Sequence, residues 1–313
     1  MPTRIADIIE PAVFAPYVIA QTTYLSNLIQ SGLITQSDRL NSLVSQGGRT
    51  LNMPIWARLV GDSEILSDTD PLTVGKIGTK KDVAVMHLRG KAWGANELAS
   101  AIAGSSAIDA IANQIAEYWV REEQKIFIST IKGVFASATM TAEHVLDKST
   151  EKISATNILD AKQLLGDFSG NLSVMVVHSA VYTELQKQNL IIYIPNARGE
   201  IVMPTYLGYR VIQDDTVPMD GSVYNTYLFT NGAFGRGDGT PVDLTPVETD
   251  RDSLQGDDIL INRRAFVLHP MGIAWKGTSA GAAPSNAELE AGTNWYRVYE
   301  KKLVGMVNLK HTI

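Results

Sequence analysis

Apolar residues recur every three or four positions between Ser106 and Phe135, in the middle of the chain. This spacing places them along one side of a helix. At 1.5 Å per residue the helix would be roughly 45 Å long. A helix of that length is more typical of a spine to which other elements attach than of one layer in a compact enzyme. Its apolar positions are Ile108, Ile111, Ala112, Ile115, Trp119, Ile126, Phe127, Ile131 and Val134.

The chain before this helix is less regular. Residues 1–46 contain three prolines, an amphipathic piece and a second short helical piece at Ser37–Val44. This segment is either a helical hairpin packed on its own core or an arm that reaches a neighbouring subunit. Its pattern alone favours the hairpin. A further short helix is predicted at Ala95–Ala103.

Two strand-like runs, Arg49–Val60 and Val83–Leu88, flank a connection with segregated charge. Such a hairpin leaves open edges and is only marginally stable when it has nothing to pack against. The charges are therefore either solvated on a surface hairpin or used to dock the loop onto another copy of the protein. The acidic residues are Asp62, Glu64, Asp68 and Asp70, and the basic residues are Lys76, Lys80 and Lys81.

After about residue 140, short helices and strands alternate and predict one α/β lobe over residues 146–254. Ser154 and Ser179 are predicted to cap helices, and Leu172–Val177 has the composition of a buried strand. The glycine-rich stretch Gly232–Gly239 is predicted to be a turn. Further strands are predicted at 201–206, 209–212, 224–229, 258–276 and 301–311.

Composition narrows the class of protein. The 313 residues include no cysteine, which excludes disulfides, thiolate metal sites and a cysteine nucleophile. The formal net charge of -6 argues against broad electrostatic attraction to nucleic acid or to an anionic membrane. The start of the chain lacks the apolar core of a secretory signal, and polar residues interrupt its most apolar stretch. We therefore expect a soluble protein of cytoplasmic origin that is not inserted in a membrane.

Candidate catalytic chemistry is sparse. The five histidines are scattered and lack metal-binding spacing, and His178 lies without the glycines of a nucleophile elbow. The acidic residues between Asp214 and Asp258 lack the spacing of a calcium-binding loop and are expected to be solvated. We predict no catalytic, cofactor-binding or metal-binding residues. An enzyme using His178 or the acidic loops is the alternative from another class of protein.

The order of the elements, from arm and charged hairpin to spine helix, α/β lobe and closing strands, resembles the major capsid proteins of tailed phages, whose fold is shared with encapsulins. The resemblance covers nearly the whole chain, and individual stretches are similar in their amino-acid sequence as well as in their order. These stretches are FAPYVIAQTTYLSNLIQSG, GGRTLNMPIW, LGYRVIQDDTVP, YNTYLFTNGAFGRGDG, HPMGIAWKG and NWYRVYEKKLVGMVNLKHT.

The resemblance implies an α+β fold of the tailed-phage major capsid type. Residues 1–46 would form the N-terminal arm and 47–88 the extended β-hairpin loop. Residues 89–145 and 255–313 would form a peripheral domain containing the spine helix, and 146–254 would form an inserted α/β axial domain. The candidate contacts between subunits are then the charged residues of the loop together with Arg121, Glu122 and Lys125 in the middle of the spine helix.

The implied function is structural. Pentamers and hexamers of the protein would assemble in the host cytoplasm into the icosahedral head of a tailed phage, around its double-stranded DNA. A separate or removed scaffold, a portal and decoration proteins are the expected partners, with only non-specific proximity to the DNA. No covalent crosslink between subunits is predicted. An encapsulin-like nanocompartment shell is the alternative within the same fold.

Overall fold

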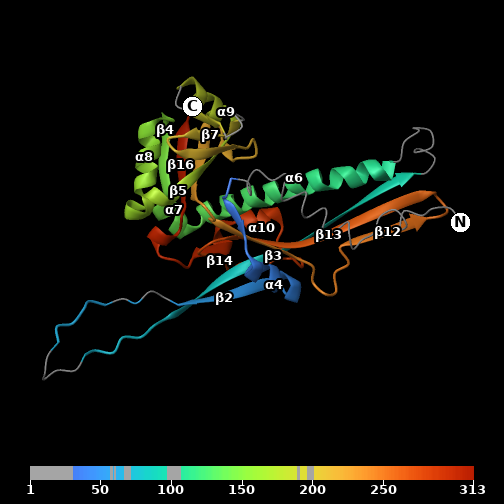
Figure 1. Ribbon diagram of the computed structural model, residues 1–313, viewed down its shortest axis with the longest axis horizontal. Helices are drawn as coiled ribbons and strands as arrows, with labels where there is room; N and C mark the ends of the chain where they lie inside the picture. The colour runs from blue at the N-terminus through green and yellow to red at the C-terminus, as the bar shows by residue number, and fades with distance from the viewer. Residues whose placement is uncertain are drawn as a thin grey trace.

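The computed structural model describes residues 31–56, 59, 61–66, 72–96, 107–188, 191–195 and 201–313. Figure 1 shows an elongated molecule in which one long helix, α6, lies along an extended sheet and ends beside a second, more compact lobe. A narrow hairpin projects from the sheet at one end of the molecule. The first thirty residues of the predicted arm lie outside the described residues.

Helix α6 spans Ala107–Ala136, so the predicted spine helix is confirmed. Its apolar stripe faces the protein interior: Ile115, Trp119 and Ile131 are each at most 1% exposed. Near its end, a Cβ on Gly133 would lie 1.9 Å from the carbonyl oxygen of Leu289, so only glycine permits this close approach to the short helix α10 (Asn286–Glu290). The period of the apolar positions therefore determines both the helix and the face that it buries.

The sheet along the molecule has six strands in the order β1-β11-β13-β3-β2, with β12 paired to β13. The longest strand, β3, continues through Asn96, so the helix predicted from Ala95 is wrong at its first two residues, and positions 97–103 lie outside the described residues. The β2–β3 pair is an antiparallel hairpin, as predicted. The strands are β1 (Ile34–Gln36), β2 (Thr50–Trp56), β3 (Thr79–Asn96), β11 (Phe234–Gly239), β12 (Val247–Asp252) and β13 (Asp257–Pro270).

Strand β11 corrects the turn predicted at Gly232–Gly239 from Phe234 onward, whereas Gly232 and Ala233 do lie in a turn. Its residues alternate between glycine and larger side chains, which suits a strand whose two faces meet different neighbours. A Cβ on Gly237 would lie 2.6 Å from the Cβ of Leu40 in helix α4 (Asp38–Gln46), so the glycine face allows α4 to pack directly on the sheet. The opposite face carries Arg236 and Asp238 toward α6.

The compact lobe is an eight-stranded sheet in the order β4-β16-β10-β5-β8-β7-β6, with β9 paired to β10. Its apolar core contains residues of α8 and α9 packed with one face of this sheet. The opposite face contributes Val174, Val176 and Phe229 to a core shared with α6. The strands are β4 (Val145–Lys152), β5 (Leu172–Val177), β6 (Ile191–Pro195), β7 (Ile201–Tyr206), β8 (Tyr209–Gln213), β9 (Met219–Asp220), β10 (Val223–Thr230) and β16 (Met306–Thr312).

The helices of this lobe show which predicted caps are right. Ser154 caps α8 by accepting a hydrogen bond from the backbone N–H of Asn157 at 3.3 Å, as predicted. For α9 the predicted cap, Ser179, is wrong: the ring Nδ1 of His178 accepts from the backbone N–H of Ala180 at 3.1 Å. The helical elements around the lobe are α7 (Ala138–His144), α8 (Ala155–Gln163), the 3-10 turn η1 (Gly166–Asn171) and α9 (Ser179–Lys187).

The closing part of the chain connects the two sheets. Strand β16 lies between β4 and β10, although the predicted division of the chain groups residues 255–313 with the spine helix. Arg297 bridges the same region, because its guanidinium contacts Glu143 at 2.6 Å and the ring Nε2 of His144 at 3.2 Å. The remaining elements are β14 (Ile273–Trp275), η2 (Gly292–Asn294), β15 (Trp295–Arg297) and η3 (Lys301–Leu303).

Candidate assembly surfaces

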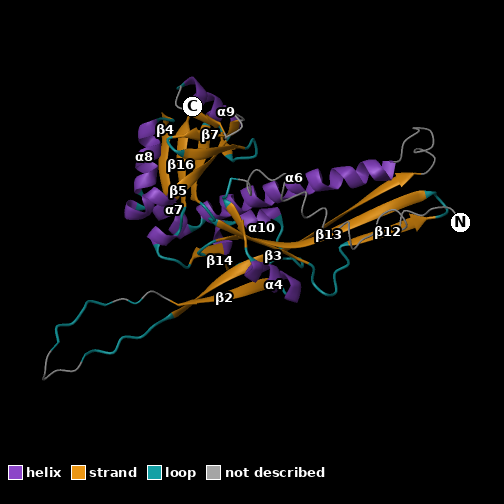
Figure 2. Ribbon diagram, in the orientation of Figure 1, coloured by secondary structure: helices purple, strands orange, loops and turns teal. Residues whose placement is uncertain are grey.

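The described residues between β2 and β3 leave the body as two extended stretches, drawn in teal in Figure 2, and together they are called the extended loop. Its described apolar side chains face solvent: Ile65 is 96% exposed, Val74 is 92% exposed and Trp56 is 68% exposed. Leu59, Leu66, Leu72 and Ile77 are also exposed. Single exposed apolar residues are ordinary, but seven among the described residues of one projecting segment are typical of an interaction surface.

The charged residues predicted on this loop lie on it as expected, and those that are described are exposed. Asp62, Glu64 and Lys76 face solvent, whereas Asp68 and Asp70 lie outside the described residues. The Glu64 carboxylate accepts a hydrogen bond from the backbone N–H of Thr73 at 2.9 Å, linking the two sides of the loop. This hydrogen bond holds the pKa of Glu64 below its usual value.

The other two lysines lie at the root of the loop and contact the body. Lys80 donates from Nζ to the carbonyl oxygen of Val298 at 3.0 Å. The carbonyl oxygen of Lys81 accepts from the Tyr296 hydroxyl at 3.4 Å. The predicted set of loop charges therefore divides into an exposed group on the projecting part and two lysines tied to the segment around β15.

The spine-helix residues predicted to contact other subunits lie on its surface. Arg121 and Lys125 are exposed. Lys125 forms an ion pair with Glu122 at 2.7 Å, one turn earlier on the same helix. An exposed pair of this kind adds little stability by itself. The structure therefore shows how Glu122 and Lys125 are paired within the subunit and leaves Arg121 at the surface, available to a neighbouring subunit.

Glu123 lies between Glu122 and Lys125 on α6. It takes part in a buried ion cluster that the sequence did not predict. Its carboxylate contacts Arg264 of β13 at 2.9 Å and Arg236 of β11 at 3.1 Å. Asp238 completes the cluster, 2.8 Å from Arg236 and 3.3 Å from Arg264. Trp119 lies beneath it, with its ring centre 5.4 Å from the Arg264 guanidinium carbon. The cluster joins α6 to two strands of the six-stranded sheet.

The electrostatics of this cluster follow from its burial. Arg236 is 1% exposed, and the removal of water raises the pKa of Glu123 despite the two nearby arginines. Burial acts to lower the pKa of Arg236, but the Glu123 and Asp238 carboxylates outweigh it and raise that pKa. The signal in the sequence was the alternation of charge and glycine in Gly235–Gly239, which is the period of a strand. Matching Glu123 to it required the tertiary structure.

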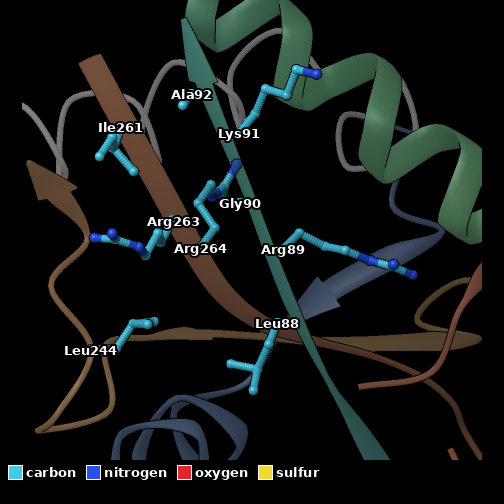
Figure 3. A pocket seen from close by; sticks show the side chains of 9 residues that line it. All are labelled: Leu88, Arg89, Gly90, Lys91, Ala92, Leu244, Ile261, Arg263 and Arg264. Atoms are coloured by element: carbon cyan, nitrogen blue, oxygen red, sulfur yellow. The ribbon is translucent and has the colours of Figure 1, made fainter. Parts of the chain in front are cut away.

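A shallow groove of about 360 Å³ crosses the paired strands β3 and β13. Figure 3 shows that successive β3 side chains leave the strand on opposite sides, with Arg89 and Lys91 directed toward the helix and Leu88 and Ala92 away from it. Arg89 is held by the carbonyl oxygen of Pro284 at 2.8 Å and the Asn286 side chain at 2.9 Å. The groove is lined by Leu88, Arg89, Gly90, Lys91, Ala92, Leu244, Ile261, Arg263 and Arg264.

The chemistry of this groove differs from that of a substrate pocket. Arg264 belongs to the ion cluster, and Arg263 contacts Glu248 at 2.9 Å. Gly90 and Ala92 are exposed and leave a nearly flat sheet surface. Small-molecule sites are typically concave and carry a few polar groups aimed at one point. The arginines that line this groove are instead engaged within the chain.

The histidines occupy separate structural positions. His178 caps α9, His269 lies beside Asp82 at 3.0 Å, and His311 contacts Thr226 at 2.8 Å. Within the described part of the chain, no three His, Asp or Glu side chains are grouped as metal ligands. Asp214, from the acidic stretch, is 4% exposed and accepts from the backbone and hydroxyl of Thr216, so it is buried where solvation was expected.

Comparison with known proteins connects this geometry to a family. The family model Gp13-like, described as major capsid protein 13-like, matches residues 100–307. The major capsid protein of Bacillus phage SPP1 is 42% identical over 322 residues, covering 99% of this chain and 98% of the relative. Across the described residues, no helix combines the length and the apolar composition needed to cross a membrane.

Solved structures show the same fold. The capsid of Ralstonia phage GP4 matches with a TM-score of 0.63 at 9% identity, covering 90% of this chain and 88% of that chain. The capsid of a native GTA particle matches with a TM-score of 0.56 at 11% identity, covering 94% and 91%. These findings confirm the predicted α+β capsid fold and the role of major capsid protein in a tailed-phage virion, and they disfavour the encapsulin-like alternative. The chain belongs to the Gp13-like family of major capsid proteins.

Proposed function

We propose that copies of this chain assemble as pentamers and hexamers into an icosahedral head that encloses double-stranded DNA, with the extended loop supplying contacts between copies. The observation that carries this proposal is the series of exposed apolar residues on the loop, including Ile65 and Val74. Burial of apolar surface stabilises a protein or complex by about 25 cal/mol per Å². Because these side chains are exposed in the subunit, they contribute this stabilisation only when a partner covers them. A second copy is the partner that a closed shell provides at every loop.

The predicted domains give each part a role in this assembly. Residues 1–46 would act as an arm, 47–88 as the extended loop, and 89–145 with 255–313 as the peripheral domain. Residues 146–254 would form the axial domain that meets its copies around the fivefold and sixfold axes. Exposed apolar residues in this lobe support such contacts; they include Ile192, Tyr193, Leu207 and Met219.

The role is structural, and we propose no catalytic residue. The ring Nδ1 of His178 is engaged in capping α9, which accounts for this histidine as a structural residue. The net charge of -6 suits a container for DNA, because many lysines facing the genome would hold it by releasing its counterions and hinder its exit. A scaffolding protein, a portal and decoration proteins are the further partners that we propose, with the DNA close by and bound without specificity.

Electron microscopy of the purified protein tests the proposal most directly. The expected result is capsomers, tubes or shells in negative stain, from the protein expressed alone or with a scaffolding protein. Protein that stays monomeric at high concentration under both conditions would contradict the proposed assembly. Co-purification with a cargo enzyme, in place of phage DNA and a portal, would instead point to a nanocompartment.

Charge reversal tests the docking role of the loop. Replacing Asp62, Glu64, Asp68 and Asp70 with lysine should reduce assembly while the circular dichroism and thermal unfolding of the subunit stay the same. Asp160→Lys, Asp167→Lys, Asp215→Lys and Asp220→Lys together are the control, because these four acids are exposed in the other lobe and their replacement changes the net charge by the same amount. Equal loss of assembly in both variants would show that total charge, and not the loop, matters.

A further inference from the structure

The extended loop is attached to the body at a place where strand β3 changes partners. Strand β3 pairs with β13 only as far as Met86, which lies opposite Val267. From Val85 toward the loop, β3 pairs with β2, in a register that ends with Thr79 opposite Trp56. The hairpin therefore leaves the sheet next to the last residues of β13. Contacts at this root decide the direction in which the loop projects.

One carboxylate makes the buried contact at the root. Asp82 is 1% exposed, and its Oδ2 lies 3.0 Å from the ring Nε2 of His269 near the end of β13. The same oxygen accepts from the backbone N–H of Gly272 at 3.2 Å. Gly272 has a φ of +81° in the turn between β13 and β14, which glycine adopts without strain. A single side chain thus ties the hairpin to both the strand end and the turn that follows.

The stability of the sheet alone does not account for a carboxylate here. Among the described residues, the other oxygen of Asp82, Oδ1, is buried without a hydrogen-bond partner. A buried polar atom in this state costs free energy, and an apolar residue would fill a strand position without that cost. The remaining root contacts are less buried: the exposed Lys80 side chain donates to a backbone carbonyl, and the backbone carbonyl of Lys81 accepts from the half-buried Tyr296. The directional contacts of Asp82 are what an apolar residue could not supply.

We propose that Asp82 is a positioning residue that fixes the direction of the extended loop, and through it the angle between neighbouring subunits. The inference rests on the proposed assembly. From Leu72 to Asp82 the chain spans roughly 30 Å at about 3.3 Å per extended residue. A rotation of about 10° at the root therefore moves the far part of the loop about 5 Å, more than the roughly 4 Å over which apolar atoms remain in contact.

Distance measurements between two spin labels test this directly, because the chain has no native cysteine to remove. Ser63→Cys places one label on the exposed loop and Gln114→Cys places the other on the exposed surface of α6. In the unassembled full-length subunit, Asp82→Ala should broaden the distance distribution or shift it by about 5 Å. An unchanged distribution in a folded Asp82→Ala subunit would overturn the inference.

Asp214→Ala is the matched control. This aspartate is also buried, at 4% exposure, and also makes two polar contacts, here hydrogen bonds from the backbone and hydroxyl of Thr216, but it lies in the other lobe. It should leave the label distances unchanged, and an equal change would show only general loosening and overturn the assignment. Asp82→Asn covers the case in which Asp82→Ala does not fold. Its amide keeps the volume and one acceptor, so a smaller broadening is expected, and no broadening would count against the proposal.

Particle size provides the second readout. If wild-type protein assembles, Asp82→Ala should widen the distribution of shell diameters or yield open tubes, whereas Asp214→Ala shells should keep the wild-type diameter. Wild-type protein that never assembles would contradict the proposed function, while the label distances would still test Asp82. Shells of wild-type size from Asp82→Ala, with unchanged label distances, would refute the inference and leave the proposed function standing.

Discussion

Strand β3 and the extended loop that leads into it obtain their stability in different ways. Toward Asn96 the strand pairs with β13 under α6, where Trp119 is buried and donates to Asn262 at 2.6 Å. Toward Thr79 it enters the extended loop, whose apolar residues are exposed. Strand β3 is stabilised within the subunit, since Ala84, Val85 and Met86 next to the loop are also buried. The loop instead carries apolar surface whose burial requires another chain, so the strand serves folding and the loop serves assembly.

Charge is distributed along the same division. In the body, Glu123, Asp238, Arg236 and Arg264 neutralise one another in a closed cluster. On the loop, Asp62 and Lys76 remain in water. Buried charges need partners already in place, whereas exposed charges can be paired later at little cost. The difference predicts that substitutions in the body act on folding and those on the loop act on assembly.

The largest effect is expected at Glu123. Glu123→Ala leaves two buried arginines with one carboxylate, and removing one member of a buried ion pair typically costs about 3–5 kcal/mol. Urea unfolding of the unassembled subunit should show a loss of about 4 kcal/mol. The neighbouring variant Glu122→Ala removes only an exposed pair and should cost about 0.5 kcal/mol or less. Similar losses at both positions would mean that the cluster adds no more than a surface pair.

A slightly smaller effect is expected where α6 meets α10. Alanine normally stabilises a helix relative to glycine by about 1 kcal/mol. In Gly133→Ala, however, the new Cβ would lie 1.9 Å from the backbone oxygen of Leu289, so the two helices must separate. We expect a loss of about 3 kcal/mol, measured by denaturant unfolding. Gly75→Ala on the loop meets nothing within 4 Å and should change stability little. A neutral Gly133→Ala would show that α10 moves freely.

Acid should destabilise the body through its buried histidines. Burial lowers the pKa of His144 to about 4 and that of His87 to about 3. The unfolded chain binds protons near pH 6.5 while the folded chain does not, so stability falls as pH drops from about 6.5 toward 4. The His144 contribution should be about 2 kcal/mol by pH 4.5. Unfolding measured against pH should show a shallower slope in His144→Gln; an identical slope would exclude this residue as a cause.

The sequence predicted the parts of the fold whose pattern is local. The 3.6-residue period identified α6, and the apolar run Leu172–Val177 matched β5. It failed at β11, because glycine and charge are typical of turns even when they alternate with the period of a strand. That alternation has a tertiary cause, since α4 packs on the glycine face and the ion cluster forms on the other. A short stretch of sequence around β11 does not contain both α4 and the residues of the ion cluster.

The candidate contact residues, like the fold, could be predicted from the sequence only where the pattern is local. The loop charges and Arg121 are at the surface because solvated charge follows from composition and position alone. Glu123 carries the same charge as Glu122 and follows it directly in the sequence. The helical turn between them directs Glu123 toward Arg264 in the interior, whereas Glu122 pairs with Lys125 at the surface. Its role depends on Arg236 and Arg264, more than a hundred residues later in the chain. Asp82 was missed for the same reason, since His269 reaches it only in the folded sheet.

The smallest effect on the subunit, and the sharpest test of the comparison, is expected on the loop itself. Ile65→Ser with Val74→Ser replaces side chains that are 96% and 92% exposed, so the free energy of unfolding should change by less than about 0.5 kcal/mol. Assembly, followed by sedimentation and microscopy, should nevertheless fall sharply, because these side chains have apolar surface to bury only against another copy.

Val242→Ser is the control, since this side chain is equally exposed at 92% but lies in the connection between β11 and β12. If it weakens assembly as much, apolar exposure in general drives association and the loop has no special part. If the loop variant instead destabilises the isolated subunit, its apolar residues must pack within their own chain. The division between a folding role for β3 and an assembly role for the loop would then fail, because both would contribute to the same free energy of unfolding.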